Sequence, residues 1–151
     1  MMARTHVAFG ILVGLFFITP YSFFNKIVFM AFIIIGSLLP DIDTPKSKLG
    51  KKIKPIAHLF SFVFGHRGIL HSIWLPAALL IIHYYFFSNT ILFALAIGCI
   101  SHLVLDSFTI QGINFIHPFQ KLHVSGFVET GKIFELAVFF IIISMIIVKL
   151  L

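Results

Sequence analysis

The sequence predicts an all-α membrane protein: a polytopic bundle of about five spans with a short interfacial or re-entrant helix, forming one integral-membrane domain over residues 1–151. Three observations predict this class. Hydrophobic residues make up 60% of the chain, charged residues only 11%, and the mean hydropathy is +1.10. Soluble domains are about 45–50% apolar and roughly 25% charged. This composition excludes a soluble enzyme, a coiled coil, a disordered regulator and a secreted disulfide scaffold.

Five apolar runs are the predicted spans. They fall at about residues 7–19, 27–39, 72–87, 90–105 and 133–151. Most are shorter than the roughly 20 residues that a spanning helix prefers, so mildly polar end residues would extend them to the membrane interface. The short breaks at 20–22 and 88–89 predict tight hairpin connections. The run 56–65 is too short to cross a bilayer and is the predicted interfacial or re-entrant piece.

Basic residues predict the orientation of these spans. With five spans, the N-terminus and the stretches 40–71 and 106–132 share one side, which carries nine of the eleven Lys and Arg residues. Lys26 and Lys149 are the two on the other side. The positive-inside rule therefore predicts a multi-pass protein of the inner (cytoplasmic) membrane with its N-terminus and long loops in the cytoplasm. A signal peptide over residues 1–22 is the alternative, although no small-x-small cleavage site follows its apolar core.

Histidine and carboxylate side chains gather at the span ends on that same side. They are His6 at the first span, Asp41 and Asp43 after the second, His66 and His71 before the third, and His102 and Asp106 at the end of the fourth. Ionisable groups in membrane segments are costly and usually mark a functional site. Because four separate span ends bring His or Asp to one layer, we predict a single polar site there.

The spacing of these residues favours metal binding. His102 and Asp106 lie four residues apart, so they point from one face of a helix, as paired metal ligands do. Asp41 and Asp43 follow a proline in a turn, where both carboxylates can approach a cation, although an Asx turn or a helix cap is the structural alternative. The predicted metal ligands are His6, Asp41, Asp43, His71, His102 and Asp106. Histidine with carboxylate suits one or two divalent ions, Zn²⁺ first and Mn²⁺ or Fe²⁺ next.

Phosphoester hydrolysis is the chemistry that such a site favours, because bound metals polarise the phosphoryl group and activate water. The predicted catalytic residues are His66, Arg67 and Asp43, with the Arg67 guanidinium or the His66 ring offsetting charge on the phosphate. Five lysines between residues 46 and 54 predict contact with anionic lipid headgroups. The expected partners are the lipid bilayer and a phospholipid or other phosphoester substrate, and nucleic acid is the disfavoured alternative.

Two further polar features lie outside the predicted set of metal ligands. Glu135 enters the fifth span near its cytoplasmic end, and we expect a helix-end cap there, with a late metal ligand as the alternative. Residues 114–119 are expected to fold over the site as a cover.

Several motifs together resemble one known family. They are His6…Gly10, Pro40-Asp41-Ile42-Asp43, His66-Arg67-Gly68-x-x-His71-Ser72, Ser101-His102-x-x-x-Asp106 and Gly112…Pro118-Phe119. From residue 4 to about 120 this series resembles the YdjM family of membrane-bound metal-dependent hydrolases. The resemblance implies a small helical inner-membrane protein with a divalent-metal site. A weaker, fold-level similarity links the pattern to zinc-dependent phospholipases C.

A non-enzymatic membrane protein is the alternative function. In that case the His/Asp cluster would form a structural metal, haem or ion-binding site, since paired histidines near span ends can ligate haem. The far halves of the first, second and fifth spans are almost purely apolar, which argues against an ion pathway through the bilayer.

Overall fold

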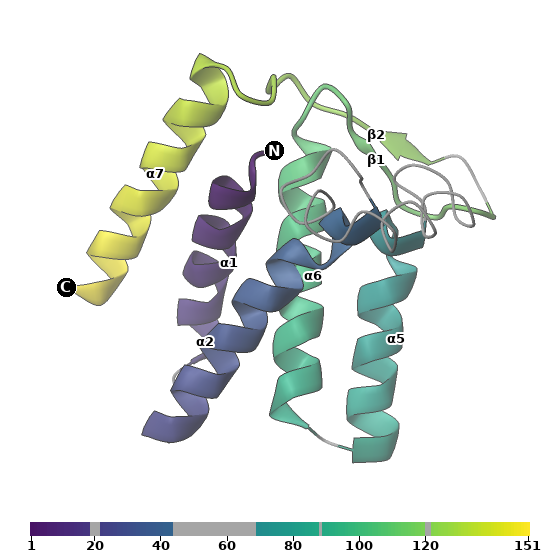
Figure 1. Ribbon diagram of the computed structural model, residues 1–151, viewed down its shortest axis with the longest axis vertical. Coiled ribbons are helices and arrows are strands. Elements are labelled where there is room, and N and C mark those ends of the chain that lie inside the picture. Colours follow the sequence, from purple (N-terminus) through teal and green to yellow (C-terminus); the bar gives the residue numbers. More distant parts are fainter. Residues whose placement is uncertain (19–21, 44–68, 88, 120–121) are drawn as a thin grey trace.

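The computed structural model describes residues 1–18, 22–43, 69–87, 89–119 and 122–151, which are mainly helical (Figure 1). The α-helices are α1 (Ala3–Phe17), α2 (Phe23–Leu38), α5 (Trp74–Ile82), α6 (Thr90–Ser107) and α7 (Ile133–Leu150). Three short helical turns join them: the 3₁₀ turns η1 (Pro40–Asp43) and η2 (Ile69–His71), and the π turn η3 (His83–Phe87). The all-α prediction is confirmed, and the expected interfacial piece at 56–65 lies outside the described residues.

The helices form a bundle in which α6 is the central element. It packs against α1, α2 and α5, whereas α7 packs chiefly against α1 at one edge of the bundle (Figure 1). The N-terminal ends of α1, α5 and α7 and the C-terminal ends of α2 and α6 point toward the same end of the bundle. The span ends that carry the predicted ligands are therefore neighbours in space.

Glycines allow α2 and α6 to approach each other very closely. A Cβ atom added to Gly36 would lie 2.4 Å from the carbonyl oxygen of Leu95, and one added to Gly98 would lie 2.4 Å from that of Ile33. Small residues at such contacts are typical of helices that pack in membranes, where close backbone approach supplies the attraction. This contact fixes the position of α2 beside the middle of α6.

The outer surface of the bundle is strongly apolar. Within the described residues, α6 and α7 are each 18 residues long and apolar enough to cross a membrane. The apolar helices α1, α2 and Trp74–Phe86 are shorter. Large apolar side chains on α7, such as Phe140 and Val148, are exposed. Exposed apolar side chains in this number suit contact with lipid rather than with water.

A short β-ribbon interrupts the stretch that follows α6, and the sequence did not predict it. Strands β1 (Ile113–Asn114) and β2 (His123–Val124) pair antiparallel. Gly112 precedes the ribbon with φ +58°, a conformation that favours glycine. The backbone N–H of Ile73, just before α5, donates to the carbonyl of Phe115, which ties this segment to the end of the bundle where the ligands lie.

Candidate metal centre

Five of the six predicted metal ligands come together in the described structure. They are His6 on α1, Asp41 on η1, His71 on η2, and His102 and Asp106 on α6. Their ligand atoms form two overlapping groups, His6 with His102 and Asp106, and Asp41 with His71 and His102. Within each group these atoms lie within 4.8 Å of one another. The convergence that the sequence predicted is therefore present.

Asp106 lies at the centre of three imidazole rings. Its Oδ1 is 3.3 Å from Nε2 of His6, and its Oδ2 is 3.7 Å from Nε2 of His102 and 4.0 Å from Nε2 of His71. The rings of His6 and His102 stack with centroids 3.8 Å apart. All four residues are at most 1% exposed. Such a buried set of nitrogen and oxygen donors has the chemistry of a transition-metal site.

The backbone of α2 orients His102. Nδ1 of His102 lies 2.7 Å from the carbonyl oxygen of Ser37, so the Nδ1–H donates and the lone pair is left on Nε2. A backbone carbonyl in this position is the usual way to fix the tautomer of a metal-binding histidine. Ser37 follows Gly36, and His102 lies one turn after Gly98, so the close contact of α2 and α6 sets this geometry.

Two ring nitrogens in the cluster lack a hydrogen bond within the described chain, and one of them, Nε2 of His102, fits a bound cation. Nδ1 of His6 and Nε2 of His102 are buried and accept no hydrogen bond from any residue in the described parts of the chain. Buried polar atoms are nearly always hydrogen-bonded, so each exception needs an explanation. A metal ion beside Asp106 would satisfy Nε2 of His102, which makes the residues present a good fit to a metal.

Asp41 approaches the cluster from the turn after α2. Burial raises the pKa of Asp41 above its ordinary value, against the opposing effect of the His6 and His71 rings. A cation bound next to this carboxylate would favour its ionised form. Asp41 therefore has the position of a metal ligand, and a bound metal would favour the ionised form that binds it.

The structure does not describe the side chains of the predicted catalytic residues. The backbone of Asp43 belongs to η1, but its side chain lies outside the described part of the structure, as do His66 and Arg67. Their roles therefore stay predictions.

Glu135 holds α7 to the start of α1, a role that the sequence showed only in part. It is buried, and its Oε2 accepts from the backbone N–H of Gly131, two residues before α7 begins, as expected for a helix-end cap. Its Oε1 accepts from the backbone N–H of Met2 and from the hydroxyl of Thr5, which precedes the candidate ligand His6. A single acidic residue near the start of an apolar span was the only sequence signal, and it did not show which helix Glu135 would contact.

Glu135→Gln tests this role. The amide keeps one acceptor oxygen but turns its NH₂ group toward a donor, so we expect a loss of about 1–3 kcal/mol in the free energy of unfolding. The matched control is Glu129→Gln, which removes an exposed pair with Lys132 that we expect to contribute less than about 1 kcal/mol. Thermal unfolding of the purified variants measures both. Equal stability of the two variants would contradict the role assigned to Glu135.

A helical fold with membrane-length apolar helices and a buried group of histidines around an aspartate defines a class: small helical membrane proteins with a candidate metal centre. The family model described as YdjM inner membrane protein matches residues 1–151, and the chain belongs to this family. Family membership confirms the resemblance drawn from the motifs and supports a location in the membrane.

Three relatives are similar to this chain. The uncharacterized protein YvsG of Bacillus subtilis (strain 168) is 31% identical over 137 residues, which cover 89% of this chain and 85% of YvsG. The inner membrane proteins YdjM of Escherichia coli (strain K12) and Shigella flexneri are each 37% identical over 91 residues. That match covers 56% of this chain and 46% of each relative, so it spans less than half of their length. No solved structure matches the chain.

Proposed function

We propose that this chain is a membrane-embedded, divalent-metal-dependent hydrolase that acts on phosphoesters such as lipid headgroups. The observation that carries the proposal is the arrangement of three buried imidazoles around Asp106. It is supported by His102, whose Nδ1–H donates to the carbonyl of Ser37 while its Nε2 has no hydrogen-bond partner within the described residues. The proposed ligands are His6, Asp41, Asp43, His71, His102 and Asp106, and Zn²⁺ is the first candidate for the metal.

The two groups of candidate ligands allow either one or two bound metal ions. His102 belongs to both groups, and its Nε2 can bind only one ion. Oδ1 of Asp106 faces His6 and accepts from the amino group of Met1, whereas Oδ2 faces His71 and His102. A bridge between two ions would therefore require an ion to replace the amino group at Oδ1. The site could hold one ion, shared by both groups, or two ions bridged by Asp106. The measured ratio of metal to protein distinguishes these two arrangements.

Each part of the site has a proposed role in hydrolysis. A bound divalent ion would supply a Lewis acid and an activated water. The histidines and carboxylates would hold the ion, and the burial of Asp106 and the three histidines would exclude bulk water from it. Arg67 and His66 would offset the charge on the phosphate, with Asp43 as the third catalytic residue.

The proposed orientation places this site at the cytoplasmic surface of the inner membrane. We propose five spans, with the N-terminus and the two long loops in the cytoplasm. Support comes from the basic residues, nine of eleven of which lie in those segments, and from the helix ends that share one end of the bundle (Figure 1). A site at that depth would lie level with phospholipid headgroups.

Removing and restoring the metal tests the function. The full chain, purified in detergent, is expected to contain one or two equivalents of metal and to release headgroups from phosphatidylethanolamine and phosphatidylglycerol vesicles. A chelator should abolish this release, and added Zn²⁺ should restore it. Elemental analysis and headgroup release measure the two steps separately.

Other outcomes would contradict the proposal in different ways. Metal that is retained without any turnover would favour a structural metal site, and a Soret absorbance band would favour haem. Absence of metal from the folded chain would contradict both the metal centre and the hydrolase.

A further inference from the structure

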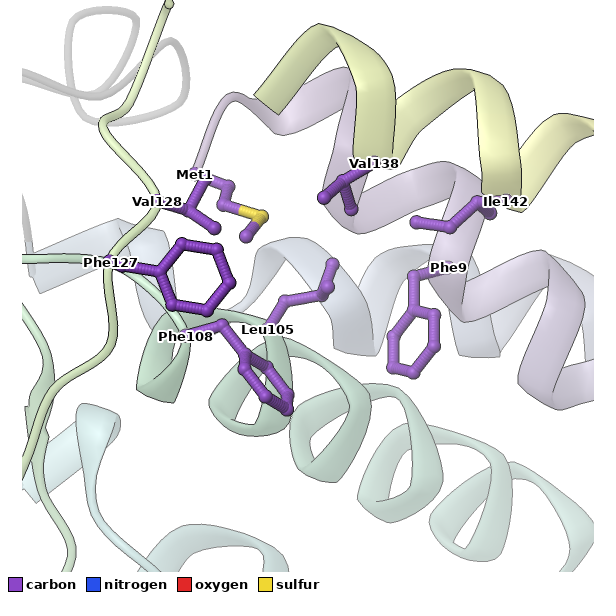
Figure 2. Close-up of a pocket in the computed structure, with 8 residues that line it drawn as sticks. All are labelled: Met1, Phe9, Leu105, Phe108, Phe127, Val128, Val138 and Ile142. Atoms are coloured by element: carbon purple, nitrogen blue, oxygen red, sulfur yellow. The ribbon is translucent and has the colours of Figure 1, made fainter. Parts of the chain in front are cut away.

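An apolar pocket of about 240 Å³ lies between α1, α6, α7 and the segment that follows the β-ribbon (Figure 2). Every side chain that lines it is apolar. Met1, Leu105 and Ile142 are buried in its floor, whereas the rings of Phe108 and Phe127 are exposed at its rim. The pocket therefore has apolar walls and an exposed aromatic edge.

The size and lining of this pocket restrict what it can hold. Apolar cavities of about 150 Å³ stay free of water and accept a guest as small as benzene. Pockets that enclose whole small molecules measure roughly 300–1,000 Å³. A pocket of about 240 Å³ with no polar side chain in its wall therefore suits a segment of one hydrocarbon chain.

The pocket shares a wall with the candidate metal centre. Leu105 lines the pocket, and the next residue of α6 is Asp106. Met1 also lines the pocket, and its amino group donates to Oδ1 of Asp106 at 2.5 Å. The other walls belong to α1 and to α7, the latter being, with α6, one of the two membrane-length helices in the described chain.

We propose that this pocket holds one acyl chain of the phospholipid whose headgroup is presented to the metal centre. The inference rests on the proposed function and narrows its substrate to a lipid, in preference to a water-soluble phosphoester. With the chain between α6 and α7, the polar end of the lipid lies at the end of the bundle where Asp106 and its histidines are. The apolar pocket thereby positions the headgroup, and the buried cluster performs the chemistry.

Photolabelling tests the inference. The full chain is placed in phosphatidylcholine vesicles with a trace of phosphatidylglycerol that carries a diazirine in one acyl chain, and labelled residues are identified by mass spectrometry. We expect Phe108, Phe127 and Val138 to be labelled more strongly than Ile141, which is 58% exposed on α7 and lines no part of the pocket. Val138→Phe, which fills the pocket, should reduce labelling of the two rim phenylalanines to the level found at Ile141. Ile141→Phe is the matched control and should leave that labelling unchanged.

Metal analysis of the same samples separates this inference from the proposed function. If Val138→Phe retains metal and Phe108 and Phe127 are still fully labelled, the proposal that the pocket holds an acyl chain is wrong. Wild-type labelling no stronger in the pocket than at Ile141 would also overturn it, whatever the variants do. Strong pocket labelling in a chain without metal would support the lipid pocket and overturn the hydrolase.

Discussion

Asp106→Asn should strip the metal from the protein. The substitution keeps the shape of the side chain but removes the negative charge that faces Nε2 of His6, His71 and His102. Loss of an outer-shell partner typically weakens metal affinity about 10- to 100-fold, and loss of a ligand carboxylate should exceed that range. Elemental analysis of the purified variant should therefore find it nearly free of metal, and a zinc titration should show affinity lower by more than about a hundredfold.

Glu129→Gln is the control for Asp106→Asn, because it also turns a carboxylate into an amide, at an exposed position outside the cluster. It should retain the wild-type amount of metal. Thermal unfolding adds a second readout: a ligand at about 100 times its Kd stabilises the folded state by roughly 2.7 kcal/mol. Zinc should accordingly raise the Tm of the wild type and of Glu129→Gln, but not that of Asp106→Asn. Equal metal content in the two variants would contradict the site.

The sequence was informative about the fold because polar residues are so scarce in it. Apolar runs located all the α-helices of the described structure, within a few residues, but not the 3₁₀ turns η1 and η2. The run at 72–87, for example, corresponds to α5 followed by the π turn η3. The β-ribbon was missed for a physical reason: strands of two residues are too short to show the alternation of apolar and polar side chains that identifies a strand.

The grouping of the candidate ligands could be predicted, but most of the groups that support them could not. Each ligand carries a distinctive side chain at a span end, so its type and depth are visible in the sequence. The acceptor for His102 is the backbone carbonyl of Ser37, and a carbonyl is present at every residue. Which carbonyl reaches Nδ1 depends on how closely α2 approaches α6, a tertiary distance that periodicity does not determine. Asp41 is different again, because its Asp-x-Asp motif favoured a turn as well as a ligand, and the structure places it in a turn beside the cluster.

The second large prediction concerns the close approach of α2 and α6. Gly98→Ala places a Cβ 2.4 Å from the carbonyl oxygen of Ile33 and 2.8 Å from the Cα of Gly36, and neither backbone atom can move without moving α2. Overpacking of this kind costs about 1–3 kcal/mol or more. The shift should also draw the Ser37 carbonyl away from His102, so zinc affinity should fall by the roughly 10- to 100-fold expected for a lost outer-shell partner.

Gly14→Ala is the matched control for Gly98→Ala, because the same change on α1 meets only movable atoms. The added Cβ would contact Met30 Sδ at 3.1 Å and the end of the Ile33 side chain at 3.0 Å, and alanine is the better helix former by about 1 kcal/mol. Thermal unfolding without metal and a zinc titration should show Gly14→Ala close to the wild type in both. If Gly98→Ala lost stability but bound zinc normally, the Ser37 carbonyl would not be what orients His102. A fall in both quantities would show that one backbone contact sets the packing of the bundle and the geometry of its metal centre.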